Sequence, residues 1–281
     1  MGFDGVSLLE VLNLVYLGDD EIEPEKQVGK IRMGFDNFIG EDLYYQNEVD
    51  MSKPSIKFGD TIFVKNTEPK CSFKEREEFD IQFDLFCGAY KGSINVAFEP
   101  FGDQVWFEER TIRSVDGSGQ IRVVLGFLSN ATVANLEIQL LNIFATSSVH
   151  GIVAARNSKL DLPACTSVLF WKSPANKIEV GRDGVIPLSK SRVGVPLDSE
   201  LYVDMSLNID GDHYTDTASF DPLTTGGQFV QVGNPEKKAK ICVKVTSDPR
   251  VSSIYSTYGY LGREWDGDHD DYDDSEEDTE E

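Results

Sequence analysis

An acidic stretch in the second half of the chain offers the best-placed metal ligands in the sequence. Asp210, Asp212 and Asp216 lie within seven residues of one another, with His213 between them. Carboxylates this close together, in a loop between two strands, could bind Ca²⁺. The same Asp-Gly-Asp run is also typical of a hairpin turn. We keep the three aspartates as a weak calcium candidate and expect no metal ion and no cofactor.

The other residues able to do chemistry are scattered. The histidines are His150, His213 and His269, and the sequence contains no nucleophile elbow, P-loop, dinucleotide-binding glycine motif or His-Glu-x-x-His motif. Glu109 and Arg113 are four residues apart, but their segment is predicted as a strand end and a turn, so we expect surface charges. The sequence therefore predicts no catalytic residues, and we expect a protein that is not an enzyme.

The elements that would carry such residues are short strands. Residues 78–85 (EFDIQFDL) and 200–207 (ELYVDMSL) alternate between apolar and polar side chains, as half-buried strands do. Turn-forming dipeptides such as Asp183-Gly184 separate these runs, and no long amphipathic helix is evident. This pattern favours an all-β fold of antiparallel β-sandwiches. Six residues are predicted to point into the cores, namely Ile81, Phe83, Leu85, Val203, Met205 and Leu207.

The two halves of the chain resemble each other. Besides the two runs above, residues 97–101 (AFEPF) match 219–223 (SFDPL), and 121–125 (IRVVL) match 241–245 (ICVKV). Nine such pairs follow one another in the same order at a nearly constant offset, which is too long for a solenoid repeat. We predict an internal duplication, with one sandwich over residues 1–133 and a homologous sandwich over residues 134–263.

Charge excludes several classes of partner. The chain of 281 residues has 26 basic and 49 acidic residues, a net charge of −23, whereas nucleic acids and anionic membranes require clustered positive charge. We expect neither as a partner. No secretory signal or membrane-spanning run is recognisable, which predicts a cytoplasmic or nuclear location.

The C-terminal segment differs from the rest in composition. Of the 18 residues in 264–281, 12 are Asp or Glu and none is Lys or Arg, so we predict a disordered acidic tail. Ser275, followed by three acidic residues, is a candidate phosphorylation site. The closest positive cluster in sequence consists of Lys237, Lys238, Lys240 and Lys244, and we expect the tail to contact it only transiently and in a salt-dependent manner.

Several segments carry a family resemblance. Residues 149–157 (VHGIVAARN) and 183–203 (DGVIPLSKSRVGVPLDSELYV) resemble an uncharacterised cereal plant domain, found alone or attached to jasmonate-induced ribosome-inactivating-type proteins. The resemblance covers about residues 7–247 and departs from the family in residues 28–37 and in the tail. It implies a setting in plant stress or defence and no catalytic residues. The chain lacks room for an additional ribosome-inactivating domain, so we exclude N-glycosidase activity.

Three functions remain open. The first is a non-enzymatic protein-interaction scaffold of plant stress or defence type, whose partner is another protein. The second is an acidic chaperone of basic proteins, similar to histone chaperones in its acidic tail. The third is a carbohydrate-binding protein, which would require exposed aromatic rings. The sequence predicts neither the partner nor the oligomeric state.

Overall fold

The computed structural model describes residues 6–23, 29–35, 47–48, 55–57, 59–62, 69–72, 77–98, 105–141, 146–224, 226–232 and 240–247, and they form a nearly all-β protein. Its strands are β1 (Val6–Tyr16), β2 (Lys30–Phe35), β3 (Asn47–Glu48), β4 (Lys70–Ser72), β5 (Glu77–Leu85), β6 (Tyr90–Phe98), β7 (Val105–Arg113), β8 (Gln120–Leu141), β9 (Ser147–Asn157), β10 (Ser167–Lys172), β11 (Ile178–Val180), β12 (Val185–Ile186), β13 (Arg192–Pro196), β14 (Leu201–Ile209), β15 (Asp212–Phe220), β16 (Gly226–Val232) and β17 (Lys240–Ser247). The helical elements of the described residues are two 3-10 turns, η2 (Pro163–Cys165) and η3 (Pro174–Asn176). The predicted all-β class is therefore confirmed.

The strands form three antiparallel sheets. An eight-stranded sheet contains the path β16-β17-β8-β1-β4, with β7, β12 and β13 also paired to β8. A five-stranded sheet has the order β10-β9-β14-β15, with β11 paired to β9, and a four-stranded sheet has the order β3-β2-β5-β6.

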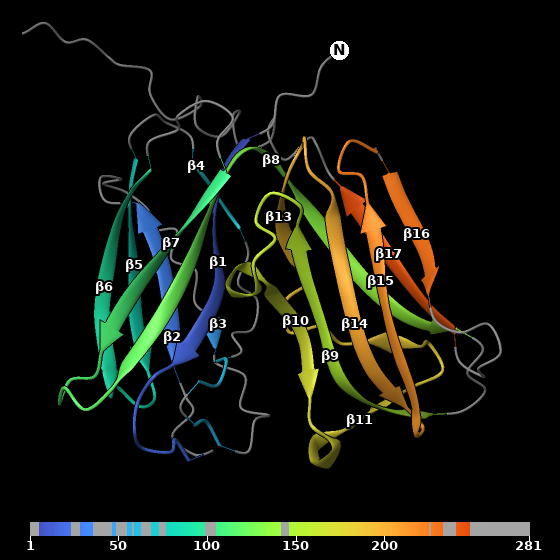
Figure 1. Cartoon of the computed structure of the whole chain (residues 1–281), viewed down its shortest axis with the longest axis horizontal. Coiled ribbons are helices and arrows are strands. Elements are labelled where there is room, and N and C mark those ends of the chain that lie inside the picture. Colours follow the sequence, from blue (N-terminus) through green and yellow to red (C-terminus); the bar gives the residue numbers. More distant parts are fainter. Residues whose placement is uncertain are drawn as a thin grey trace, which may run out of the picture.

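The long strand β8 connects the two groups of strands seen in Figure 1. Its residues 120–128 pair with β7, and residues 121–131 pair with β1. Its later residues pair with β17 on one side and with β12 and β13 on the other. Asn130 has a left-handed backbone with φ of 49°, and it lies where β8 passes from the first set of partners to the second. The predicted boundary between residues 133 and 134 therefore falls inside a continuous strand.

Two large apolar cores lie on either side of the point at which β8 changes partners. The first joins β1 and the early part of β8 to β5 and β6, and the second joins the later part of β8 and β17 to β9, β14 and β15. Ile81, Phe83 and Leu85 lie in the first core. Val203, Met205 and Leu207 lie in the second. Between them along the strands, Asp84 is exposed, whereas Gln82, Asp204 and Ser206 are half-buried.

A third, smaller core joins the two groups of strands. Leu8 and Leu12 lie on the side of β1 opposite the first core, and they pack with Val124, Leu128 and the segment around η2. Leu160 and Cys165 of that segment are both buried there. Besides the continuous strand β8, an apolar contact therefore fixes the position of one group of strands against the other.

The proposed sandwich boundaries stay predictions. The acidic tail (residues 264–281) and Ser275 lie outside the described residues. Glu109 and Arg113 both belong to β7, so they lie in an extended strand and are exposed.

Candidate functional site

The outer surface of the five-stranded sheet has a cluster of polar side chains, which we call the polar face. These residues alternate with core residues along β9, β14 and β15, so they project away from the second core. Their registers place Arg156 opposite Tyr202, and Asp204 opposite Thr217. The polar face consists of Arg156, Tyr202, Asp204 and Thr217, with Asp161 and Glu200 from the adjoining loops.

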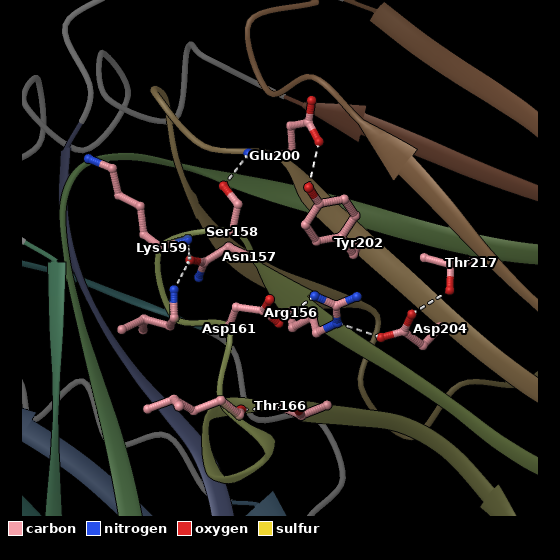
Figure 2. Close-up of polar contacts among 12 residues, drawn as sticks. Arg156, Asn157, Ser158, Lys159, Asp161, Thr166, Glu200, Tyr202, Asp204 and Thr217 are labelled. Carbon is pink, nitrogen blue, oxygen red and sulfur yellow. Dashed lines mark hydrogen bonds and ion pairs between the residues drawn. The ribbon is translucent and has the colours of Figure 1, made fainter.

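Arg156 is the centre of the polar face (Figure 2). Its Nε donates to Asp204 Oδ2 at 2.7 Å, and its Nη1 donates to Asp161 Oδ1. Its guanidinium carbon lies 4.6 Å from the centre of the Tyr202 ring, within the range of a cation–π contact. The hydrogen bond that Arg156 donates to Asp204 is the main reason why the pKa of Arg156 is raised, and desolvation opposes it. The cation is thus held in one orientation by two carboxylates and a ring.

The neighbours of Arg156 are fixed in turn. Asp204 Oδ1 accepts from Thr217 Oγ1 at 2.7 Å, and the Tyr202 hydroxyl donates to Glu200 Oε2 at 2.7 Å. The bond to Glu200 is the first cause of the raised pKa of Tyr202. The loop after β9 is closed by Asn157 Oδ1, which accepts from the backbone N–H groups of residues 159 and 160. The face is therefore preorganised on rigid strands, which reduces the entropy cost of binding.

The chemistry of the polar face suits binding. Arg156 forms an ion pair with Asp204, and its guanidinium lies over the ring of Tyr202. Arg and Tyr are the residue types that, with Trp, contribute most often to the energetic centres of protein interfaces. The side chain of Leu162, 47% exposed in the loop beside η2, adds apolar surface one residue after Asp161.

A second polar cluster is buried between the two groups of strands. Glu10 on β1, Ser167 on β10 and Lys190 before β13 are each no more than 3% exposed. Glu10 Oε1 accepts from Lys190 Nζ and from Ser167 Oγ, the latter at 3.1 Å. Glu10 Oε2 accepts from the Gly194 backbone N–H at 2.7 Å. We call this set the Glu10 cluster.

The Glu10 cluster is saturated with hydrogen bonds. Lys190 Nζ also donates to the backbone carbonyl of Val11 at 3.3 Å and to Ser167 Oγ at 3.1 Å, which uses the three donors of its ammonium group. A Cβ on Gly194 would lie 3.0 Å from Glu10 Oε2 and 2.4 Å from Leu128 Cδ1, so the close approach requires glycine. A serine–lysine pair can serve nucleophilic catalysis only if the lysine accepts a proton. Here the lysine is a buried donor paired to a carboxylate, and the arrangement joins β1 to β10 and β13.

The three aspartates of the calcium candidate serve different purposes. Asp210 forms the β14–β15 turn with φ of 53°, and its Oδ1 accepts from the Ser148 backbone N–H at 2.8 Å. Asp212 and Asp216 are each two residues from the buried Tyr214, so they lie on the same, core-facing side of the edge strand β15 while staying exposed. Charges that point inward at a sheet edge hinder pairing with another chain. In the described part of the chain, no group of three or more His, Cys, Asp or Glu side chains is arranged to hold a metal ion.

Burial affects the thiols of two cysteines, Cys165 and Cys242. Burial, followed by the charge of Glu109, raises the pKa of Cys165 to about 11. Burial also raises the pKa of Cys242. Since the thiolate is the reactive form, these two thiols are poor nucleophiles at neutral pH.

Sequence reasoning missed both clusters. Lys190 is 180 residues from Glu10, and Arg156 is 48 residues from Asp204. The available signal for the first was a glutamate inside the apolar run LLEVL at residues 8–12. The polar face had no comparable signal in the sequence, because charged residues at outward positions of strands are common.

The fold and these clusters define a nearly all-β protein of antiparallel sheets, with a polar face on the five-stranded sheet and a buried ion pair that joins two groups of strands. No helix of the described residues is long and apolar enough to cross a membrane. A family model described as "Domain of unknown function (DUF6598)" matches residues 88–245, more than half of the chain. The chain therefore belongs to this family. Comparison with curated proteins and with solved structures gave no match. The match begins between β5 and β6, ends in β17, and includes all members of the polar face.

Proposed function

We propose that the chain consists of two tandem β-sandwiches that arose by duplication and share the strand β8. The strand pairing supports this proposal. In the first half β5 pairs with β2 and β6, and its counterpart β14 pairs with β9 and β15. Likewise, the first part of β8 pairs with β1 and β7, and its counterpart β17 pairs with β8 and β16. Tyr90 pairs with Leu85 after one hairpin turn and Tyr214 pairs with Leu207 after the other, and both tyrosines are buried.

We further propose that the protein is a non-enzymatic interaction scaffold whose partner is another protein, and that it binds this partner through the polar face. The observation that carries the proposal is the preorganised contact of Arg156 with Tyr202 and Asp204. The ring and the guanidinium together offer an amphipathic surface at low entropy cost, which is the usual character of an interface centre. The resemblance to domains of jasmonate-induced proteins supports a role in plant stress or defence.

The polar face can be tested with one double variant and one control. Arg156→Ala combined with Tyr202→Ala removes the centre of the face, whereas Arg110→Ala removes an arginine, 48% exposed, that pairs with Glu108 on β7. Quantitative affinity capture from hormone-treated plant tissue is expected to lose its specific partners with the double variant and to keep them with Arg110→Ala. The same partners with both variants would reject the polar face as the binding surface.

The second candidate is an acidic chaperone of basic proteins, which the net charge of −23 favours. Attraction between exposed charges is screened over about 8 Å at physiological salt, so capture of a basic protein should weaken as salt rises. Binding of a core histone by the full chain is compared with binding by a chain ending at Arg263. Equal binding by both chains, or binding by neither, would reject this function for the tail.

A further inference from the structure

The outer surface of the late part of the eight-stranded sheet has a different character from the polar face. Outward positions on β16, β17 and β8 lie side by side, with Phe229 opposite Lys244 and Lys244 opposite Glu137. Lys240 lies four residues before Lys244 on the same side of β17. Arg192, the first residue of β13, pairs with Asn135 at an outward position. We call this surface the lysine face; β16 lies at its edge (Figure 1).

An aromatic ring is exposed at the edge of the lysine face. Phe229 is 65% exposed, and Lys244 Nζ lies 5.8 Å from the centre of its ring. The ring lies beside Gly227, two residues earlier on the same side, where a Cβ would be 3.4 Å from Phe229 Cε2, an ordinary van der Waals contact. Covering this ring would remove apolar surface from water, which stabilises a contact by about 25 cal/mol per Å² of apolar area.

The charge of the lysine face is opposite to that of the whole chain. Lys240, Lys244 and Arg192 against Glu137 give 3 − 1 = +2, whereas the chain as a whole is −23. The natural complement of this face is therefore an acidic segment with aromatic residues. Residues 248–281 have that composition, with 13 acidic residues, 2 arginines, 4 tyrosines and Trp265.

The place where this segment begins also fits. β17 ends at Ser247, so residues 248–281 follow directly after the strand that carries Lys240 and Lys244. A flexible chain of 34 residues has a root-mean-square span of about 30 Å, enough to reach back over three strands about 4.8 Å apart. Tethering keeps its effective concentration near the millimolar range, so contacts that are weak between separate molecules are populated within one molecule.

We propose that the C-terminal segment, residues 248–281, docks reversibly on the lysine face of its own chain, with its carboxylates at Lys240 and Lys244 and an aromatic ring against Phe229. In the docked state, the segment covers the exposed ring of Phe229, and its acidic residues are engaged by the lysine face. A basic partner of the tail would then have to compete with the lysine face, so docking sets a threshold for capture.

Zero-length carbodiimide cross-linking of the full chain tests the contact, because it joins a lysine to a carboxylate only where they touch. Lys57 and Lys91, with side chains 66% and 60% exposed, serve as reference lysines. We expect cross-links from Lys240 and Lys244 to residues 264–281 to exceed those from the reference lysines by about threefold, in line with the strength of exposed ion pairs. In 1 M NaCl, where the screening length is about 3 Å, the difference should disappear.

Two further arms keep the outcome unambiguous. An equal mixture of ¹⁴N- and ¹⁵N-labelled chains distinguishes cross-links within one chain from those between copies. Phe229→Ala retains both lysines and is expected to lower the cross-link yield about twofold, the lower range of an aromatic contact, while Gln231→Ala on the same strand leaves it unchanged. Equal labelling of all lysines, a yield insensitive to salt or to Phe229→Ala, or cross-links only between copies would overturn the proposal.

Discussion

Removing the ammonium group of the Glu10 cluster should destabilise the protein strongly. Lys190→Met keeps most of the side-chain volume and leaves the Glu10 carboxylate with Ser167 Oγ and the Gly194 N–H as donors. Both Glu10 and position 190 are almost fully buried, so water cannot replace the lost cation. Removing one member of a buried ion pair costs about 3–5 kcal/mol of unfolding free energy. Because two donors remain, we expect about 3 kcal/mol.

The double variant gives the sharper result. Glu10→Gln added to Lys190→Met removes the unpaired charge while an amide oxygen still accepts from the Gly194 N–H. We therefore expect the double variant to be more stable than Lys190→Met alone, with a coupling free energy of about 2 kcal/mol or more. A purely steric role of Lys190 would instead make the second substitution an additional loss.

Urea unfolding followed by circular dichroism measures the free energies, and hydrogen exchange with mass spectrometry locates the change. Since Lys190 and Gly194 hold β1 against the second group of strands, Lys190→Met should speed exchange in β1 and β13 more than in β5. A loss below about 1 kcal/mol for Lys190→Met, or a double variant less stable than the single one, would refute the reasoning.

Three other expectations follow from the packing and charges. Phe83→Ala and Met205→Ala, in the first and second core, should each cost about 2–5 kcal/mol in urea unfolding, and a loss below 1 kcal/mol would contradict their core positions. Asp216→Val removes an inward charge from the edge strand β15 and should produce concentration-dependent association in light scattering, unlike Thr215→Val on the opposite side of the strand. Hydrogen bonds, first from the Ser118 backbone, lower the pKa of Asp116 from its usual 3.8 to about 2, so its contribution to stability is present above about pH 4 and is lost as the pH falls through 2. Asp116→Asn should flatten that part of the stability profile, and an unchanged profile between pH 4 and 2 would show that Asp116 does not contribute.

The alternation of side chains made the strands and their inward residues predictable. In β5 and β14 every second residue is apolar, and a strand has only two faces, so the pattern determines which residues can share a core. The alternation cannot indicate which strands become neighbours. The predicted boundary between residues 133 and 134 lies within β8, because residues 129–134 lack the Gly and Pro signals of a turn and remain compatible with a strand.

The polar clusters were out of reach for a related reason. The aspartates at 210–216 looked like a site because they are close in sequence, but one of them forms a turn and two lie along an edge strand. The contacts of Glu10 with Lys190 and Gly194 arise only after two sheets pack together. Spacing in sequence reports on groups in one element, whereas sites between elements depend on topology.

The position of β1 has a consequence for how the chain is made. Its eleven residues include the apolar run SLLEVLNLV, and their partners on β8 lie more than 100 residues later. At a synthesis rate of about 5–20 residues per second, β1 waits for roughly 5–20 s before residue 131 is added, and longer before Lys190 is available. During this time Glu10 places a charge inside an aggregation-prone run, where such a gatekeeper opposes premature association between nascent chains. Glu10, which joins the two groups of strands in the folded protein, therefore also opposes aggregation of β1 before its partner strand β8 has been translated.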